Sequence, residues 1–358
     1  MIINLISAPK GGGAEFIVRE LHEFYLNKGL DSKVIFLSGS SLDIGNNEKV
    51  ISVKPRSPLN IFRIRKQLKL FSKYSESKLI VHAHLTWPFF YTALATLGLK
   101  NLRLVYTEHN TSNKRRKIPL FWLLERLIYR RYSKIICISE GVYESLAKWV
   151  GPRLSRRLVT IPNGSRLYQV SERFGLEDRE PRLVSVGSLT FKKNFATAIR
   201  AIGQIRDEVD SYEIVGEGPE RKRLEQLIHR EKLDDKVKLL GWSDNIEAYL
   251  QAADIQLIPS FWEGFGLVAV EGMSTGLPVV ASDVAGLREV LDRNNPAVTL
   301  VENFEHEDGW VQGLRAAINC MSVQGPEKLT LAARTQAEKF KLETMAERYL
   351  EVYRDISQ

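Results

Sequence analysis

The 358-residue chain has few cysteines and no long apolar run. Its two cysteines, Cys137 and Cys320, cannot build the kind of disulfide scaffold that stabilises small secreted proteins, so we expect two reduced structural thiols. No stretch approaches the ~20 apolar residues that span a bilayer. The first residues, MIINLISAPK, carry no basic segment before their short apolar run, so we do not expect a signal peptide. A cytosolic protein is the expectation.

Metal-ligand and cofactor signatures are also missing. No group of Cys, His and Asp residues has the spacing of a metal site, and no Asp-x-Asp element occurs in a loop suited to a metal-bound nucleotide. The glycine loop at residues 9–15 has neither the GxGxxG spacing of dinucleotide sites nor the Gly-Lys-Ser/Thr ending of a Walker loop. We therefore expect no metal ion and no bound cofactor.

Acidic residues are scarce in the first half of the chain. Residues 1–170 carry 28 Lys and Arg against 11 Asp and Glu, a net charge of +17, whereas residues 171–358 carry 23 against 32, a net charge of −9. Nucleic acid, anionic lipid and phosphorylated substrates are the candidate partners for a basic half of this kind. Ordinary solubilising charge is the less favoured explanation for so large a difference.

Short β-rich runs alternate with helical patterns along the whole chain. Eleven of these runs are predicted to be strands: IINLIS, SKVIFL, KLIVHAH, LRLVYT, KIICIS and LVTIPN in the first half, and RLVSVGS, YEIVGEG, VKLLGW, DIQLIPS and PVVAS in the second. This alternation predicts an α/β protein with two parallel, Rossmann-like sheets facing each other across a cleft, with ligands beyond the carboxyl ends of the strands. We expect an N-terminal domain at residues 1–168, a polar linker at 169–181 and a second domain at 182–339. Residues 340–358 are expected to form a final helix.

Two basic segments combine apolar residues at helical spacing with Lys and Arg. They are residues 59–74, LNIFRIRKQLKLFSKY, and residues 114–132, KRRKIPLFWLLERLIYRRY. Either could lie on anionic lipid as an interfacial helix, although a helix packed on a sheet also needs an apolar face. The charge difference between the halves favours lipid contact for at least one of them.

The stretch SFWEGFGLVAVEGMSTGLPVVAS at residues 260–282 predicts a strand end, a glycine loop and a short helix. Gly264 and Gly266 allow the backbone to approach a ligand, and the free N–H groups at the helix start suit a diphosphate. Glu271 lies about one and a half turns into that helix, and Glu263 is expected at the mouth of the loop. Carboxylates bind sugar hydroxyls and repel phosphates, so we expect both to hold the sugar parts of a ligand. The loop at residues 9–15 is a weaker candidate anion site.

Histidines offer a second candidate site. His82 and His84 lie in one predicted strand, and we expect them to face opposite sides, so that at most one, His84, reaches the ligand. A satisfied structural histidine is an equally good interpretation.

Together these motifs resemble glycosyltransferase family 4, the retaining enzymes with the GT-B fold. EGFGLVAVE matches the E-x7-E motif of the family, and the order of the other motifs agrees over nearly the whole chain. They are GGAE at 12–15, VHAH at 81–84, TEHN at 107–110, ISEGV at 138–142, PNG at 162–164, VGSLTFKKN at 186–194, VGEGP at 215–219, GLPVVASDVAGLREVL at 276–291 and the closing FKLETMAERYLEVY at 340–353.

The resemblance implies roles for matching residues. Glu271 would hold the nucleotide ribose, Glu263 the donor sugar, and Lys193 the departing phosphates. The backbone of Phe265, Gly266 and Leu267 would receive the diphosphate, and His109 would lie near the reaction centre. Gly12 and Gly13 would lie near the diphosphate or the acceptor. The closing helix would cross back onto the N-terminal domain.

Three departures from the family pattern bear on the donor. Ser188 stands in the phosphate site where the family often has an arginine, and Lys192 is a candidate for that second cation. Ser165 and Arg166 follow the PNG motif, and NPAVTLVEN at 295–303 replaces the usual Gly-Leu-Leu-Val-Pro segment. The last two changes touch the linker and the rim of the nucleotide pocket.

The sequence therefore predicts a metal-independent retaining glycosyltransferase that moves a sugar from a UDP- or GDP-sugar to a hydroxyl of a glycan or lipid-linked acceptor. We expect a role in surface polysaccharide assembly and peripheral contact with the inner face of the cell membrane through the basic half, without nucleic acid. Alternative hypotheses are a GT-B isomerase or phosphorylase, a catalytically weak partner subunit, and a basic nucleic-acid-binding protein.

Overall fold

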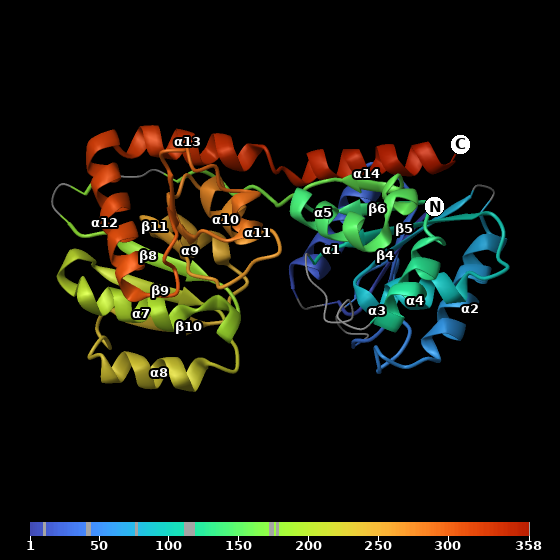
Figure 1. Cartoon of the computed structure of the whole chain (residues 1–358), viewed down its shortest axis with the longest axis horizontal. Helices are drawn as coiled ribbons and strands as arrows, with labels where there is room; N and C mark the ends of the chain where they lie inside the picture. Colours follow the sequence, from blue (N-terminus) through green and yellow to red (C-terminus); the bar gives the residue numbers. More distant parts are fainter. Residues whose placement is uncertain are drawn as a thin grey trace. The chain divides into compact units, whose positions relative to one another are not determined.

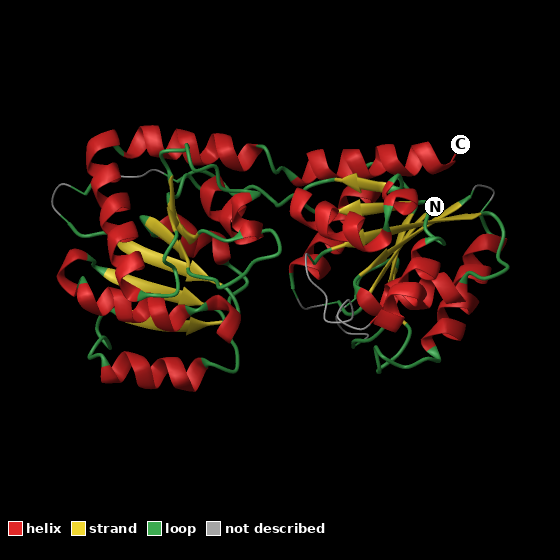
Figure 2. Cartoon of the chain, viewed as in Figure 1, coloured by secondary structure: helices red, strands yellow, loops and turns green. Residues whose placement is uncertain are grey.

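The structure is a computed structural model that describes residues 1–9, 12–40, 44–75, 78–110, 119–171, 175–176 and 179–357 (Figure 1). The chain divides into two compact units. Unit 1 comprises Met1–Gly164 and Leu342–Gln358, and unit 2 comprises Ser165–Lys341. The sequence placed these boundaries at 168 and 339, a few residues from where the chain passes between units. Both units are parallel α/β sheets, so the predicted fold class is confirmed (Figure 2).

Unit 1 is built on a seven-stranded parallel sheet with the order β3-β2-β1-β4-β5-β6-β7. The central strands are buried on both faces, as expected for near-continuous apolar runs such as IINLI and LIVHAH. The strands are β1 (Ile2–Ile6), β2 (Ser32–Phe36), β3 (Glu48–Val50), β4 (Leu79–His84), β5 (Leu102–Glu108), β6 (Lys134–Cys137) and β7 (Leu158–Thr160).

Helices cover both faces of this sheet (Figure 2). They are α1 (Gly13–Asn27), α2 (Asn60–Lys73), α3 (Thr86–Ala95), α4 (Pro119–Tyr129), α5 (Glu140–Val150), α6 (Pro152–Ser155) and α14 (Leu342–Ser357). The last helix comes from the far end of the chain and packs beside α1.

Buried polar contacts fix α14 on unit 1. The hydroxyl of Tyr353 lies 2.6 Å from Nδ1 of His82 inside the unit. At the end of the helix, Nζ of Lys134 lies 3.0 Å from Asp355, and Lys78 donates to the carbonyl of Ser357 at 2.9 Å. The closing segment of the chain is therefore part of the N-terminal unit's structure.

Unit 2 is built on a six-stranded parallel sheet with the order β10-β9-β8-β11-β12-β13. The strands are β8 (Arg182–Val186), β9 (Ser211–Val215), β10 (Val237–Gly241), β11 (Ile255–Ile258), β12 (Val279–Ser282) and β13 (Val298–Val301). The helices are η3 (Phe191–Lys193), α7 (Phe195–Gln204), η4 (Arg206–Glu208), α8 (Arg221–Arg230), α9 (Ile246–Ala252), α10 (Leu267–Ser274), α11 (Ala285–Arg288), α12 (Glu307–Gln324) and α13 (Pro326–Glu338).

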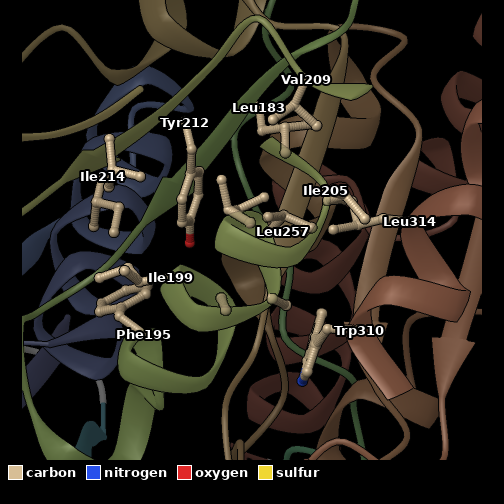
Figure 3. Packing of buried hydrophobic residues seen from close by; sticks show 14 of the residues in the cluster. Leu183, Phe195, Ile199, Ile205, Val209, Tyr212, Ile214, Leu257, Trp310 and Leu314 are labelled. Carbon is tan, nitrogen blue, oxygen red and sulfur yellow. The ribbon is translucent and has the colours of Figure 1, made fainter. Parts of the chain in front are cut away.

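The main apolar core of unit 2 fills one face of its sheet (Figure 3). Two large aromatic side chains anchor it, and each satisfies its polar atom. The hydroxyl of Tyr212 lies 2.7 Å from Oγ of Ser185, and Nε1 of Trp310 donates to the carbonyl of Phe304 at 2.9 Å. Truncation of a buried aromatic of this size costs about 3–5 kcal/mol. This core holds β8 and β11 rigidly, and both strands lead into candidate site loops.

Candidate functional site

The strand order of unit 2 reverses between β8 and β11, which are neighbours in the sheet although they are distant in sequence. In open α/β sheets, ligands bind outside the carboxyl ends of the strands at this switch point. The loops that leave the two strands contain the predicted residues Lys193 and Glu263. A backbone hydrogen bond of 2.9 Å from Phe261 N–H to the carbonyl of Lys192 joins these loops directly.

Glu263 accepts three hydrogen bonds at this point. Nζ of Lys193 lies 2.6 Å from Oε1, Nζ of Lys192 lies 3.0 Å from Oε2, and the hydroxyl of Ser260 donates to Oε1 at 2.7 Å. The carboxylate is nearly buried, with 8% of its side chain exposed, rather than open at the mouth of the loop. Burial raises the pKa of Glu263, but the two lysines and the hydrogen bonds outweigh it and lower that pKa to about 2.

Lys192 therefore points to the same carboxylate as Lys193. The sequence alone left open whether Lys192 points away, because it does not fix the direction of two consecutive side chains. Ser188 lies on the exposed part of the loop after β8 and brings no charge. The loop geometry thus offers two ammonium groups beside one buried carboxylate.

Glycines shape the loop that follows β11. Gly266 is the N-cap of α10 with φ of 92°, and a Cβ there would lie 2.6 Å from Cδ2 of Leu287. A side chain at Gly286 would come within 2.1 Å of the carbonyl oxygen of Glu263. The loop therefore depends on small residues at both positions. Phe265, which is buried, packs edge-on against Phe340 and holds the middle of the loop.

The start of α10 directs backbone N–H groups and the positive end of the helix dipole toward the loop. Leu267 is the first residue of this helix and Glu271 is its fifth. Oε1 of Glu271 lies 3.4 Å from the hydroxyl of Ser165, and the side chain is half-buried. The predicted helix was thus correct, and it places Glu271 about one turn beyond the amide groups.

An aromatic ledge lies next to the lysines, and the sequence reasoning did not name it. The ledge comprises Phe191, Phe261 and Trp262, with ring centroids 5.0 to 6.5 Å apart. Phe191 is 61% exposed and Trp262 is 53% exposed, although large aromatic side chains usually avoid such exposure. The signal available in the sequence was the placement of FK and FW immediately before the two key charged residues.

Unit 1 has its own switch point, between β1 and β4. His84, the last residue of β4, lies there with its Nδ1 3.4 Å from Nε2 of His109 and its Nε2 3.3 Å from the side-chain oxygen of Asn4. Leu85 follows with φ of 68° and ψ of 173°, a strained conformation that non-glycine residues rarely adopt. Strain of this kind concentrates at functional sites.

The expectation that His82 and His84 face opposite sides was wrong. Residues two apart in a strand share a face, and the two rings lie 4.0 Å apart. His82 binds Tyr353 and the hydroxyl of Thr107, so it is the structural member of the pair. Burial lowers the pKa of His109 to about 4 and holds the pKa of His82 and His84 well below the ordinary value, so all three are neutral at pH 7.

The glycine loop of unit 1 is described in part. Gly12 is the N-cap of α1 and Gly13 is its first residue. The carboxylate of Glu15 accepts from the N–H of Gly12 at 3.0 Å, which closes the helix start. Lys10 and Gly11 lie outside the described residues. Gly12 and Gly13 thus lie at the carboxyl edge of the sheet, after β1, and the loops that carry His84 and His109 leave the same edge after β4 and β5.

The described part of the chain contains neither a cluster of metal ligands nor a helix suited to span a membrane. No group of three or more His, Cys, Asp or Glu side chains in that part of the chain is arranged to hold a metal ion. Among the helices described, none is long and apolar enough to cross a membrane.

Two Rossmann-like parallel-sheet units, each with candidate residues at its switch point, define the GT-B class of proteins. The family model described as Glycosyltransferase Family 4 matches residues 11–167, and the model described as Glycosyl transferases group 1 matches residues 169–336. The chain belongs to glycosyltransferase family 4.

Individual relatives agree with this assignment. The chain is 37% identical over 120 residues to an uncharacterized glycosyltransferase of Methanocaldococcus jannaschii, covering 33% of this chain and 31% of that protein. It is 32% identical over 194 residues to the amylovoran biosynthesis glycosyltransferase AmsK of Erwinia amylovora, covering 49% and 46%. The chain thus spans less than half the length of these two relatives.

A solved structure matches the whole chain. The crystal structure of Alr3699/HepE from Anabaena, in complex with UDP-glucose, superimposes with a TM-score of 0.79 at 20% identity. The match covers 99% of each chain. At this identity the likeness is one of fold, and the fold is GT-B.

Proposed function

We propose that this protein is a retaining glycosyltransferase that moves a sugar from a nucleotide diphosphate donor to a hydroxyl of a glycan or lipid-linked acceptor. The observation that carries the proposal is the cluster of Lys192, Lys193 and Glu263 at the switch point of unit 2. The amide groups at the start of α10 follow directly in the chain. Cations and helix N-termini are the two devices with which proteins hold phosphates.

The reaction breaks the bond between the anomeric carbon and the diphosphate oxygen and forms a bond from that carbon to the acceptor oxygen. The acceptor's proton passes to the leaving phosphate oxygen on the same face of the sugar. Negative charge builds on the diphosphate as the bond breaks, and Lys193 and Lys192 stabilise it. Preorganised groups of this kind lower a barrier by about 3–4 kcal/mol each.

The two glutamates position the donor. Glu271 accepts hydrogen bonds from ribose hydroxyls, and Glu263 fixes the lysines and contacts the donor sugar. Neither needs to act as an acid, because a nucleotide diphosphate is already a good leaving group. The separation rule for glycosidase carboxylates therefore does not apply to them.

His109 acts through hydrogen bonds in this proposal. A buried imidazole with a pKa of about 4 is neutral at pH 7, so it contributes a donor and an acceptor rather than a charge. Gly12 and Gly13 allow an acceptor or phosphate to approach the start of α1. Ser188 is small and uncharged, so it leaves space beside Lys193 at the position where the family often has an arginine.

Surface polysaccharide assembly is the proposed context, with a UDP- or GDP-sugar as donor. The relative named for amylovoran biosynthesis and the UDP-glucose complex of a fold neighbour support this choice. The basic N-terminal unit would bring the enzyme to the inner face of an anionic membrane, where lipid-linked acceptors lie. No metal ion and no nucleic acid take part.

Calorimetry with a panel of UDP-, GDP- and ADP-sugars tests the proposal, with and without EDTA, on the wild type and on Glu271→Ala. We expect one donor class to bind selectively, unaffected by EDTA, and to lose affinity in the variant. A product assay with the bound donor then separates transfer to an acceptor from isomerisation of the donor or consumption of free phosphate.

The alternatives have distinct outcomes. If no donor binds to a normally folded chain, the protein is an inactive partner subunit or a nucleic-acid-binding protein. Steeply salt-dependent binding to DNA or RNA identifies the latter. Donor isomerisation without an acceptor contradicts the transferase reaction while leaving the donor site intact.

A further inference from the structure

Helix α4 of unit 1 has a partly inverted pattern of burial, because it buries not only Ile128 and Tyr129 but also a charged side chain. Its described residues Trp122, Leu123, Leu124 and Leu127 are 41 to 55% exposed, whereas Glu125 in the same helix is fully buried. A helix that covers a sheet normally buries its large apolar side chains and exposes its charged ones. Side chains three and four apart share one helix face, so Leu123, Leu124 and Leu127 form a continuous outward apolar stripe.

The inversion is held in place by specific contacts. The indole nitrogen of Trp149 in α5 donates to Oε2 of Glu125 at 2.8 Å, which satisfies the buried carboxylate. Nε1 of Trp122 donates to the carbonyl of Trp149 at 3.0 Å, and the guanidinium of Arg126 stacks over the Trp122 ring at 4.5 Å. The outward face is therefore a fixed feature of the folded unit.

A hollow of about 510 Å³ lies at the end of this helix. Its lining consists of Arg130, Arg153, Leu154, Arg156 and Arg157. Arg130 follows directly after α4, and the other lining residues belong to α6 and the segment that enters β7. Arg130 of the hollow thus lies only three positions after Leu127 of the apolar stripe.

The four arginines have no acidic partner among the described residues. Within the part of the chain that the structure describes, none of them forms an ion pair, and Arg157 donates to the backbone carbonyls of Arg130 and Tyr132 at 2.9 and 2.7 Å. Guanidinium groups gathered without carboxylates repel one another, and an anion removes that repulsion. Arginine binds phosphate oxygens in a paired geometry, so phosphate is the fitting anion.

The hollow is separate from the switch point of unit 1. Arg130 precedes β6 and Arg157 precedes β7, so both lie at the amino-terminal edge of the parallel sheet. His84, His109 and Gly12 follow their strands and lie at the carboxyl edge. The arginines therefore lie away from the chemistry at that edge and can serve a separate anion.

We propose that the outward stripe of α4 and the arginine-lined hollow form one membrane-docking surface, in which the hollow takes the phosphate of an anionic lipid headgroup. The apolar side chains enter the interfacial layer beside it, as in interfacial amphipathic helices. The inference deepens the membrane contact of the proposed function, but it names a site that does not depend on sugar transfer. It also selects α4 over α2, because Ile64 and Leu68 of α2 are buried and its exposed apolar residues Phe62 and Leu70 lie eight positions apart rather than on adjacent turns.

Vesicle co-sedimentation tests this surface. Wild-type chain is mixed with vesicles of phosphatidylcholine containing phosphatidylglycerol, and with vesicles of phosphatidylcholine alone. We expect the chain to bind the vesicles with phosphatidylglycerol and to bind those of phosphatidylcholine alone at least tenfold more weakly. Binding to the anionic vesicles should decrease as the salt concentration rises. Each arginine near an anionic surface contributes about fivefold, so Arg153→Glu with Arg156→Glu should lower binding at least tenfold. Leu123→Ser with Leu127→Ser should lower binding while keeping the headgroup preference.

The matched control is Lys66→Glu with Lys69→Glu in α2, which makes the same change in net charge in the same unit. We expect it to retain most of the binding. An equal loss in the control and the arginine variant would mean that overall charge is responsible, and would overturn the proposed site. Absence of vesicle binding in the wild type would also overturn it.

Two further measurements separate the possible sources of failure. The first is calorimetry with inorganic pyrophosphate. If pyrophosphate binds through the four arginines while vesicles do not bind, the ligand is a soluble anion and the docking surface is contradicted. Nucleotide-sugar binding by the arginine variant should equal that of the wild type. Loss of vesicle binding with intact donor binding therefore tests this surface independently of the transferase proposal.

Discussion

Nζ of Lys193 lies 2.6 Å from Oε1 of Glu263, and this contact joins the two loops that leave β8 and β11. A lysine whose ammonium group is held by a buried carboxylate stays in one place, as an electrostatic catalyst requires. The same carboxylate holds Lys192 through its second oxygen. In the proposed function, the two ammonium groups that this carboxylate positions receive the diphosphate of the donor.

Lys193→Ala should lower kcat for sugar transfer by about 10²- to 10³-fold, because a preorganised cation at the leaving group is lost. Lys192→Ala should cost less, since 34% of the Lys192 side chain is exposed against 15% for Lys193 and water screens its charge more. Adding Ser188→Arg to Lys192→Ala should restore part of the rate. Steady-state kinetics with the donor identified by calorimetry provide the measurement, and an unchanged rate in Lys193→Ala contradicts the assignment.

Unit 2 should lose stability in acid through Glu263. The pKa of this carboxyl is about 2 in the folded protein, against about 4.3 in an unfolded chain. The unfolded state therefore binds a proton first as the pH falls, and stabilisation of about 2–3 kcal/mol at pH 7 disappears between about pH 5 and pH 2. Hydrogen exchange of unit 2 peptides, compared between the wild type and Glu263→Gln, should show a difference at pH 7 that vanishes toward pH 2.

Gly286→Ala should reduce activity without touching any charged residue. A methyl group there would press within 2.1 Å of the carbonyl of Glu263 and displace the loop. Gly203→Ala in α7 is the control, because its nearest neighbour would be an ordinary 3.7 Å away and alanine favours a helix by about 0.5–1 kcal/mol. We expect a lower kcat with Gly286→Ala and an unchanged kcat with Gly203→Ala. Equal activity in the two variants argues against a rigid loop.

Unit 1 should weaken at a higher pH than unit 2. His82, His84 and His109 are buried, and burial lowers the pKa of each, that of His109 to about 4. Their unfolded pKa is about 6.5, so the unfolded state binds more protons below that pH and stability falls from about pH 7 toward pH 4. The slope reaches about 1.4 kcal/mol per pH unit for each histidine.

Hydrogen exchange of unit 1 peptides measures this slope. His84→Asn should reduce the change in the free energy of unfolding per pH unit by the contribution of one histidine. This holds whatever the effect of the substitution on stability at pH 7. His229→Gln replaces an exposed histidine of unit 2, so the slope of unit 1 should not change. A wild-type slope that is flat between pH 7 and pH 4 rules out buried neutral histidines.

Much of the fold follows from local pattern. Eleven strands were predicted from apolar runs bounded by turn residues, and the structure has a strand at each of them. The two missed strands, Glu48–Val50 and Val298–Val301, lie at sheet edges, where one side has no neighbour and the apolar signal is short or mixed with polar residues. The helix predicted from Leu267 to Thr275, with Gly276 as its stop, spans Leu267–Ser274 in the structure, where Gly266 before it and Gly276 after it both have positive φ.

Side-chain direction was harder to predict. The prediction that His82 and His84 face opposite sides was wrong, because side chains alternate along a strand and residues two apart therefore point to the same face. The position of Glu263 was predicted at an open loop mouth, yet two lysines and a serine draw the carboxylate into a nearly buried site. Such convergence involves residues about seventy positions apart, which no local pattern encodes.

The sequence by itself determined the parallel α/β class, the motif that carries Glu263 and Glu271, and the charge difference between the halves, because each follows from composition or local periodicity. Only the tertiary structure decided that Lys192 shares the carboxylate of Lys193, that α4 buries its glutamate and exposes Leu123, Leu124 and Leu127, and that four arginines meet at one edge of a sheet. The reason is that burial and ion pairing depend on which surfaces the packed sheet and helices bring together. Those surfaces come from segments that are distant in the chain.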